Sequence, residues 1–168
     1  MFPFRKFDPP DRVMVRKANR GVTSPRVSII LLDWSVRDHF FALDWLSRQQ
    51  APRKEYEIIW VELFDRVAPR AMDGADVVLT CGQQGMYHKH RGYNLGLLHA
   101  RGEIVTVCDS DVVFPPDFVS SILRHFIPRE GERRSLALMH YEKRTSSLYP
   151  EKAPPGEMAD LDRFTWDE

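Results

Sequence analysis

The sequence predicts a three-layer α/β/α fold with a mostly parallel central sheet, and three observations lead to this prediction. Runs of β-branched and other apolar residues at 26–33, 56–62 and 103–108 are typical of strands that are buried on both faces. Segments with helical periodicity lie between these runs, and such alternation favours a layered fold with parallel strands. The composition, 43% hydrophobic and 29% charged over 168 residues, suits one soluble domain with a core.

The first half of the predicted domain begins with the strand at 26–33. Residues 38–50 form the first expected helix, because their apolar side chains recur on one broad face. Pro52 ends this helix, since proline cannot continue the helical hydrogen bonding. The run at 56–62 is the second strand, and a third is expected at 75–80.

The second half starts with a loop at 81–92 that is rich in glycine, glutamine and basic residues. Pro115–Pro116 favours the start of a helix, because proline lacks the N–H that a first helical turn leaves unpaired. The expected elements after the loop are a helix, a strand, a helix and a strand, at residues 93–100, 103–108, 117–126 and 135–140.

The two ends of the chain are patterned less regularly than its centre. Residues 1–25 predict a basic, irregular N-terminal arm, since residues 1–30 hold seven Lys and Arg against two Asp. Such an arm can be solvated or can touch an anionic membrane surface. Residues 26–140 form the predicted domain, and residues 141–168 are expected to be an irregular tail or part of an acceptor region.

Charge and cysteine content limit the cellular compartments and the classes of partner that the sequence predicts. The 24 basic and 24 acidic residues give no net charge, which argues against nucleic acid as the main partner. Cys81 and Cys108 are too few for a disulfide framework, and the first residues lack the long apolar segment of a secretion signal. We therefore expect a cytoplasmic protein, with peripheral membrane association through the basic arm as the alternative to a purely soluble one.

An acidic pair, Asp109-Ser-Asp111, is the first candidate functional site. Two carboxylates at this spacing are common by chance, and Asp160-Leu-Asp162 repeats the spacing in the polar tail, where a solvated turn is the expected structure. The pair at 109–111 differs because an apolar strand leads directly into it. Ligands of α/β sheets bind beyond the carboxyl ends of the strands, so this pair lies where a ligand is expected.

Three segments in chain order carry a resemblance to a known family. The chain has Val27-Ser-Ile-Ile-Leu-Leu-Asp-Trp-Ser35, then Glu57-Ile-Ile-Trp-Val-Glu-Leu-Phe-Asp65, then Tyr93-Asn-Leu-Gly-Leu-Leu-His-Ala-Arg-Gly-Glu-Ile-Val-Thr-Val-Cys-Asp-Ser-Asp111. These resemble V-S-I-I-I-P-T-Y-N, E-I-I-V-V-D-D-G-S and R-N-x-G-I-x-x-A-x-G-E-Y-I-x-x-L-D-x-D of the family-two glycosyltransferases of the GT-A fold. Pro116-Asp-Phe118 resembles the segment that follows the acidic motif. The resemblance covers about residues 26–127.

The resemblance implies a metal site and a nucleotide site. Asp111 would coordinate Mn²⁺ or Mg²⁺ bridging the donor diphosphate, with Asp109 near the ribose, the sugar or the metal. Both cations prefer oxygen ligands, and either would stabilise the charge of the leaving diphosphate. Asp33 and Trp34 after the first strand, and Glu62 after the second, would contact the nucleotide. Trp34 can equally be a buried aromatic at the end of its strand.

The helix before the acidic pair has implied roles as well. Asn94 would lie on the helix that approaches the nucleotide, and Gly96 either serves the same approach or allows close packing of helix and sheet. Arg91 belongs to the basic segment 88–91, which would add positive charge near the phosphates or be a solvated loop. The chain departs from the family where Glu62-Leu63 retains one carboxylate instead of two, and where Leu32-Asp-Trp-Ser35 replaces P-T-Y-N.

The expected function is transfer of a sugar from a nucleotide-diphosphate donor, for which we expect a UDP-sugar, to a glycan, lipid or small-molecule acceptor with inversion. Inverting members resemble one another in having a general base beyond the acidic motif. Only 57 residues follow Asp111, so a truncated or non-catalytic module that binds nucleotide or acts as a scaffold is the alternative. A nucleotidyltransferase is disfavoured because residues 32–38 contain no glycine for a phosphate loop. The candidate bases in the tail are Glu142, Glu151, Glu157, Asp160 and Asp162.

Overall fold

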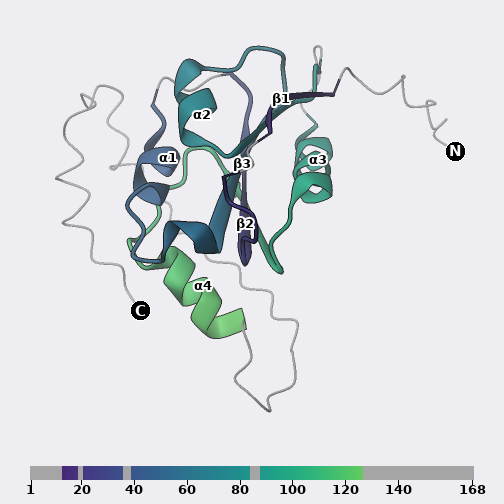
Figure 1. Ribbon diagram of the computed structural model, residues 1–168. Helices are drawn as coiled ribbons and strands as arrows, with labels where there is room; N and C mark the ends of the chain where they lie inside the picture. The colour runs from purple at the N-terminus through teal and green to yellow at the C-terminus, as the bar shows by residue number, and fades with distance from the viewer. Residues whose placement is uncertain (1–12, 19–20, 36–38, 84–87, 127–168) are drawn as a thin grey trace, which may run out of the picture. The chain divides into compact units, whose positions relative to one another are not determined.

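The computed structural model describes residues 13–18, 21–35, 39–83 and 88–126. A five-stranded sheet forms the centre of this part of the chain, with the strand order β1-β4-β3-β2-β5 (Figure 1). Four strands run parallel: β2 (Val27–Asp33), β3 (Tyr56–Glu62), β4 (Val77–Thr80) and β5 (Ile104–Asp109). Strand β1 (Met14–Ala18) pairs antiparallel with β4. The predicted mixed α/β fold with a mostly parallel sheet is confirmed.

Helices cover both faces of the sheet. Figure 1 shows α3 (Lys89–His99) on one side and the short helices α1 (Phe41–Leu46) and α2 (Pro69–Gly74) on the other. A 3-10 turn (Arg53–Glu55) precedes β3, and α4 (Phe118–Phe126) follows β5. The segment before α4 is tied to the segment after α1, because the N–H of Gln50 donates to the carbonyl of Pro116 over 2.9 Å. The three predicted layers are therefore present.

The central strands β2 and β3 are buried at every position, as expected for parallel strands between two layers of helices. Side chains alternate between the two faces of a strand, so Ile30 and Leu32 point toward α3 while Leu31 and Asp33 point to the opposite face. The core beneath α3 consists of Ile30, Leu32, Ile59, Val61, Leu63, Val77, Leu79, Cys81 and Leu95. This alternation decides on which face each polar residue at the strand ends lies.

Several elements differ from the predictions. Residues 14–18 form strand β1, although we expected residues 1–25 to be irregular. This edge strand was hard to detect because most of its side chains are exposed and two of the five are charged, as is usual for edges. Helix α1 is shorter than the predicted 38–50, and α2 was not predicted. The predicted strand at 135–140 and the tail at 141–168 lie outside the described residues.

Helix α3 begins at Lys89, four residues earlier than predicted, because Gly92 is a packing residue and not part of a loop. A Cβ atom on Gly92 would lie 2.3 Å from Cδ1 of Leu32 and 2.7 Å from Cδ2 of Leu63. A Cβ on Gly96 would lie 2.5 Å from Cγ2 of Ile30. The two glycines therefore let α3 lie directly on the sheet, and for Gly96 this is the packing role that the sequence left open.

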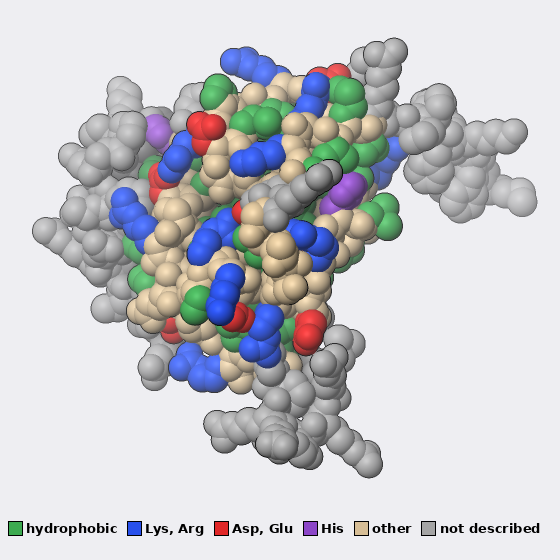
Figure 2. All heavy atoms as spheres, viewed as in Figure 1, with side chains coloured by type: hydrophobic (Ala, Val, Ile, Leu, Met, Phe, Trp, Pro, Cys, Tyr) green, Lys and Arg blue, Asp and Glu red, His purple; other side chains and the backbone are tan. Residues whose placement is uncertain are grey.

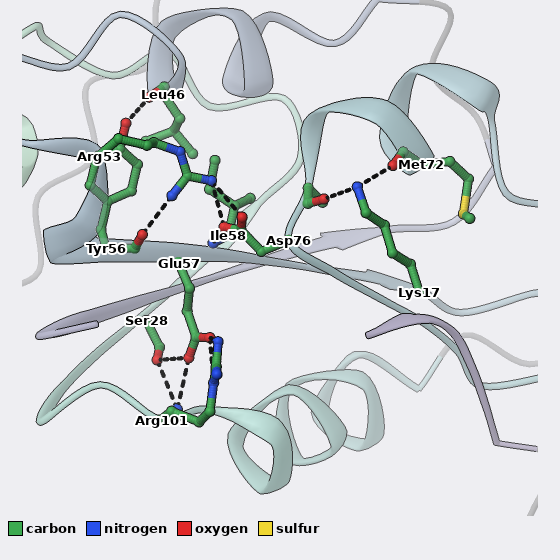
Figure 3. A network of polar contacts seen from close by, with 11 residues as sticks. Lys17, Ser28, Leu46, Arg53, Tyr56, Glu57, Ile58, Met72, Asp76 and Arg101 are labelled. Carbon is green, nitrogen blue, oxygen red and sulfur yellow. Dashed lines mark hydrogen bonds and ion pairs between the residues drawn. The ribbon is translucent and has the colours of Figure 1, made fainter. Parts of the chain in front are cut away.

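The connection from α3 to β5 is fixed by a buried carboxylate (Figure 3). Glu57 is fully buried, and it accepts hydrogen bonds from Ser28 Oγ at 2.7 Å and from the backbone N–H of Arg101 at 2.8 Å. The Arg101 guanidinium adds a second pair of contacts, at 2.9 and 2.6 Å. Gly102 is required next to it, since a Cβ there would lie 2.6 Å from the backbone nitrogen of Ser28. This network sets the register of β5, and thus of Asp109, relative to α3.

The far edge of the sheet is tied down by β1. Lys17 extends from this strand to the carbonyl oxygens of Met72 and Ala75, both at 2.7 Å (Figure 3). These two carbonyls lie in and just after α2, so the lysine also satisfies acceptors that a helix end leaves unpaired. The edge strand and α2 are thereby held to the sheet together.

Candidate functional site

A row of polar side chains crosses the sheet where its parallel strands end. Asp33 of β2 is the register partner of Glu62 in β3, and Glu62 is the partner of Thr80 in β4. Ser110 follows Asp109, the partner of Leu32, so it comes to lie beside Asp33. All four residues are buried on the face opposite α3, with Asp33 3% and Glu62 1% exposed. The carboxyl edge of the sheet therefore has a polar interior.

Hydrogen bonds within this row join the strand ends to one another. Ser110 Oγ donates to Asp33 Oδ1 at 2.7 Å, and the N–H of Ser110 donates to the carbonyl of Leu32 at 2.9 Å. Glu62 accepts from the backbone N–H of Ser35 at 3.2 Å and from that of Phe64 at 3.0 Å. Glu62 thus binds the backbone of the segments that follow β2 and β3.

The burial of Glu62 has an electrostatic consequence. Removal from water raises the pKa of the Glu62 carboxyl to about 7, against a backbone hydrogen bond from Phe64 that lowers it. The neighbouring charge of Asp33 raises the pKa further, and the hydrogen bonds from Ser35 lower it. A carboxyl with this pKa exchanges its proton near neutral pH, so the charge of the row changes in the physiological range.

Asp109 lies on the other face of the sheet, beneath α3. Lys89 Nζ lies 2.6 Å from Asp109 Oδ2, and Tyr93 Oη donates to Asp109 Oδ1 at 2.8 Å. Lys89 and Tyr93 are four residues apart on α3, which places them on the same side of the helix. One helix therefore presents a cation and a hydroxyl to the two oxygens of one carboxylate.

The amino end of α3 is rich in basic residues. Lys89, His90 and Arg91 occupy its first turn, which contains no acidic residue, and no side chain caps the helix. The helix dipole adds further positive potential at this end, which attracts anions. Gln83, 5% exposed, orients the chain that enters the helix: its Oε1 accepts from the N–H of His88 at 2.9 Å, and its Nε2 donates to the carbonyl of His88 at 3.3 Å.

The predicted site residues divide between the two faces of the sheet. Asp33 and Glu62 lie together in the buried row, whereas Asp109 lies on the α3 face. Trp34 packs partly buried against the core beneath α3, which is the structural alternative that the sequence left open, and a contact with nucleotide stays a prediction. Arg91 lies half-buried in the first turn of α3 and Asn94 is exposed one turn later, while Asp111 is half-buried on the turn after β5.

The residues that position these groups were not found from the sequence. Ser110 was read only as the spacer between two acids, and Gln83 as one residue of a polar loop. Lys89 was considered only as part of a basic segment, and Tyr93 as the start of a helix. A helix predicted from residue 89 would have revealed the spacing of four between Lys89 and Tyr93.

Asp109 and Asp111 offer oxygen ligands of the kind that a divalent cation prefers. Ser110 is turned inward to Asp33, between Asp109 on the α3 face and Asp111 on the turn. Mg²⁺ and similar cations commonly use one or two carboxylates together with substrate phosphates and water. Within the described ranges no group of three or more His, Cys, Asp and Glu is arranged to hold a metal, so the other ligands would have to come from a donor and from water.

Comparison with known proteins shows which proteins this chain resembles. Residues 77–136 match the sequence profile of glycosyl transferase family 2, a stretch that contains α3, β5 and the acidic pair. Over this stretch the chain resembles the family-two glycosyltransferases. It is also similar in structure to a mannosyltransferase from Pyrobaculum calidifontis solved in complex with GDP-Man and Mn²⁺. That likeness has a TM-score of 0.50 and 23% sequence identity over 68% of this chain, and it supports the GT-A fold.

The chain spans 36% of the length of the Pyrobaculum mannosyltransferase chain. No curated protein matches the sequence. The match to the family profile and the parallel sheet confirm the resemblance that the three sequence segments indicated.

Proposed function

We propose that this protein binds a nucleoside-diphosphate sugar and transfers the sugar to an acceptor in a metal-dependent reaction. The observation that carries the proposal is the position of Asp109 and Asp111 at the end of β5, opposite the positive amino end of α3. A diphosphate bound beside them would lie close to the helix dipole and the basic first turn as well as to the two carboxylates. Mn²⁺ or Mg²⁺, held by Asp109 and Asp111, would act as a Lewis acid on the departing diphosphate.

The residues of this chain have separate roles in the proposal. Lys89 and Arg91 attract the diphosphate, and Asn94 lies one turn farther along the same helix. Asp33 and Glu62 shape the polar edge where the nucleoside would lie, and their hydrogen bonds hold the two loops around it. Trp34, the residue after Asp33, packs against the core on the α3 face, and a contact with the nucleotide at this strand end is part of the proposal.

We propose a UDP-sugar as the donor and transfer with inversion. The Pyrobaculum mannosyltransferase was solved with GDP-Man, so both uridine and guanosine donors belong in the test. The candidate general bases Glu142, Glu151, Glu157, Asp160 and Asp162 lie outside the described residues, as does the predicted acceptor region. A glycan, lipid or small molecule is the proposed acceptor.

The cytoplasm, with contact to a membrane surface through the basic arm, is the proposed location. No helix in the described part of the chain is long and apolar enough to cross a membrane. Lys and Arg side chains, with Asp and Glu among them, are spread over the face drawn in Figure 2. That nucleic acid is not a partner stays a prediction from the zero net charge of the sequence.

Donor hydrolysis and nucleotide binding test the proposal together. Hydrolysis of a panel of UDP- and GDP-sugars should require Mn²⁺ or Mg²⁺ and stop in EDTA. Asp111→Asn should lower turnover by about 100-fold or more, as removal of a group that stabilises developing charge does. Asp73→Asn, an exposed acid on α2, is the matched control and should keep full activity.

Two outcomes would change the assignment. Turnover in Asp111→Asn at the rate of the unaltered protein would remove this residue from the metal site. Calorimetric binding of UDP or GDP with Mn²⁺, but without hydrolysis or transfer of any donor, would identify a nucleotide-binding module in place of an enzyme.

A further inference from the structure

Lys89 is placed to compete with a metal ion for Asp109. The ammonium lies 2.6 Å from Oδ2 of Asp109, and the two side chains are 34% and 31% exposed, so the ion pair is partly shielded from water. Tyr93 engages the other oxygen of the same carboxylate at 2.8 Å. The carboxylate that the proposed function assigns to a divalent cation therefore already holds a cation that belongs to the protein.

The position of Lys89 in its helix supports a role with an anion. A cation in the first turn is disfavoured by the helix dipole, which is positive at that end. Asp109 offsets this cost while it is bonded to Lys89. If the carboxylate were taken by another cation, an anionic ligand at this helix end would compensate the charge of the ammonium.

The sequence of α3 points in the same direction. In the family segment R-N-x-G-I, the position of the arginine is occupied here by Tyr93, followed by Asn94 and Gly96. Lys89 precedes Tyr93 by four residues and lies on the same side of the helix. Lys89 thus presents a cation to Asp109 from one helical turn before Tyr93. Its long side chain is flexible enough to move between two partners.

The geometry points to Lys89 as a resident counter-ion that a divalent cation displaces from Asp109 and that then binds the diphosphate of the donor. Tyr93 keeps its hydrogen bond to Oδ1 of Asp109 and holds the carboxylate in place during the exchange. Metal and donor binding are thereby coupled, because the ammonium leaves the carboxylate most readily when a phosphate is there to receive it. This inference rests on the proposed function for the identity of the ligands.

Direct binding of Mn²⁺, followed by electron paramagnetic resonance, tests the exchange without any turnover. In the absence of nucleotide, Lys89→Met should bind Mn²⁺ about fivefold more tightly than the unaltered protein, the factor that corresponds to loss of a partly exposed ion pair. Lys89→Gln should behave in the same way. Lys54→Met, which removes an exposed lysine from the 3-10 turn before β3, is the matched control and should leave the affinity unchanged.

The second half of the test uses UDP in saturating Mn²⁺. Lys89→Met should here bind UDP about fivefold more weakly, since it has lost a charge that contacts phosphate. The opposite signs of the two effects are the distinctive result, because a merely structural lysine would weaken both. Equal or weaker Mn²⁺ binding in Lys89→Met would overturn the exchange.

The failure of this inference can be told apart from that of the proposed function. Metal-dependent donor hydrolysis with an unchanged Mn²⁺ affinity in Lys89→Met leaves the enzyme assignment intact and overturns the counter-ion role. Tighter Mn²⁺ binding in the variant without hydrolysis of any donor supports the displacement of Lys89 and removes the transferase.

Discussion

The buried carboxyl of Glu62 should make the stability of the protein depend on pH between about 4.5 and 7. Its pKa is raised from 4.5 to about 7 in the folded protein, chiefly by burial. An acid whose pKa is higher in the folded than in the unfolded protein contributes to the free energy of unfolding. This contribution is fully present below the pKa of the unfolded state, and it is lost as the pH rises through the pKa of the folded state. The predicted loss is on the order of 2–3 kcal/mol over this range, from the change in proton affinity.

Glu62→Gln isolates this contribution, because glutamine resembles the protonated acid and does not titrate. The free energy of unfolding should be measured by urea denaturation at several pH values between 4.5 and 8 for both proteins. The stability of the unaltered protein relative to Glu62→Gln should be greatest near pH 4.5 and should fall by 2–3 kcal/mol, again an order-of-magnitude figure, by about pH 7.5. Using the difference removes the titration of the other acids.

Glu103→Gln serves as the control, since Glu103 is exposed near the opposite end of β5. The change with pH in the stability difference should be larger for Glu62→Gln than for Glu103→Gln. A constant difference between the unaltered protein and Glu62→Gln at every pH would refute the reasoning, because it would mean that Glu62 has the same proton affinity in the folded and unfolded states.

Two further predictions concern the residues that hold the elements of the site in place. Gly92→Ala should lower the free energy of unfolding by about 1–3 kcal/mol, because its Cβ would overlap Leu32. Gly74→Ala should cost less, since the nearest atom to its Cβ would lie at 3.1 Å. Thermal denaturation of both variants compares the two costs. Arg101→Met should cost about 2–4 kcal/mol in urea denaturation because it leaves the buried charge of Glu57 without its guanidinium partner, and a cost below about 0.5 kcal/mol would show that the backbone N–H and Ser28 suffice.

The sequence was sufficient to predict the parallel sheet because its central strands carry an unmistakable pattern. β2 and β3 are buried at every position, so their apolar runs stand out from the neighbouring segments, and the predicted limits of β3 agree with the structure. Strand β1 was missed because an exposed edge strand needs few apolar residues. Its pairing with β4 depends on contacts with distant residues, among them the bonds from Lys17 to Met72 and Ala75.

The start of α3 could not be predicted because its glycines act through tertiary packing. Glycine is a poor helix former, and an isolated sequence gives no reason to place Gly92 inside a helix. In the fold, the space above Leu32 and Leu63 admits only a residue without a Cβ. The consequence for the site is direct, since the four additional residues include Lys89 and bring it to Asp109.

The division of the site between two faces follows from strand periodicity and register. Leu32 and Asp109 are partners in β2 and β5 and share the α3 face, so Asp33 and Ser110 must share the other. Knowledge of the register alone would therefore have separated Asp109 from Asp33 and Glu62. A donor that uses both sets must cross the carboxyl edge of the sheet, with its diphosphate toward α3 and its nucleoside toward the buried row. Substitutions on the α3 face should consequently alter metal and phosphate binding, whereas those in the buried row should alter base preference and stability.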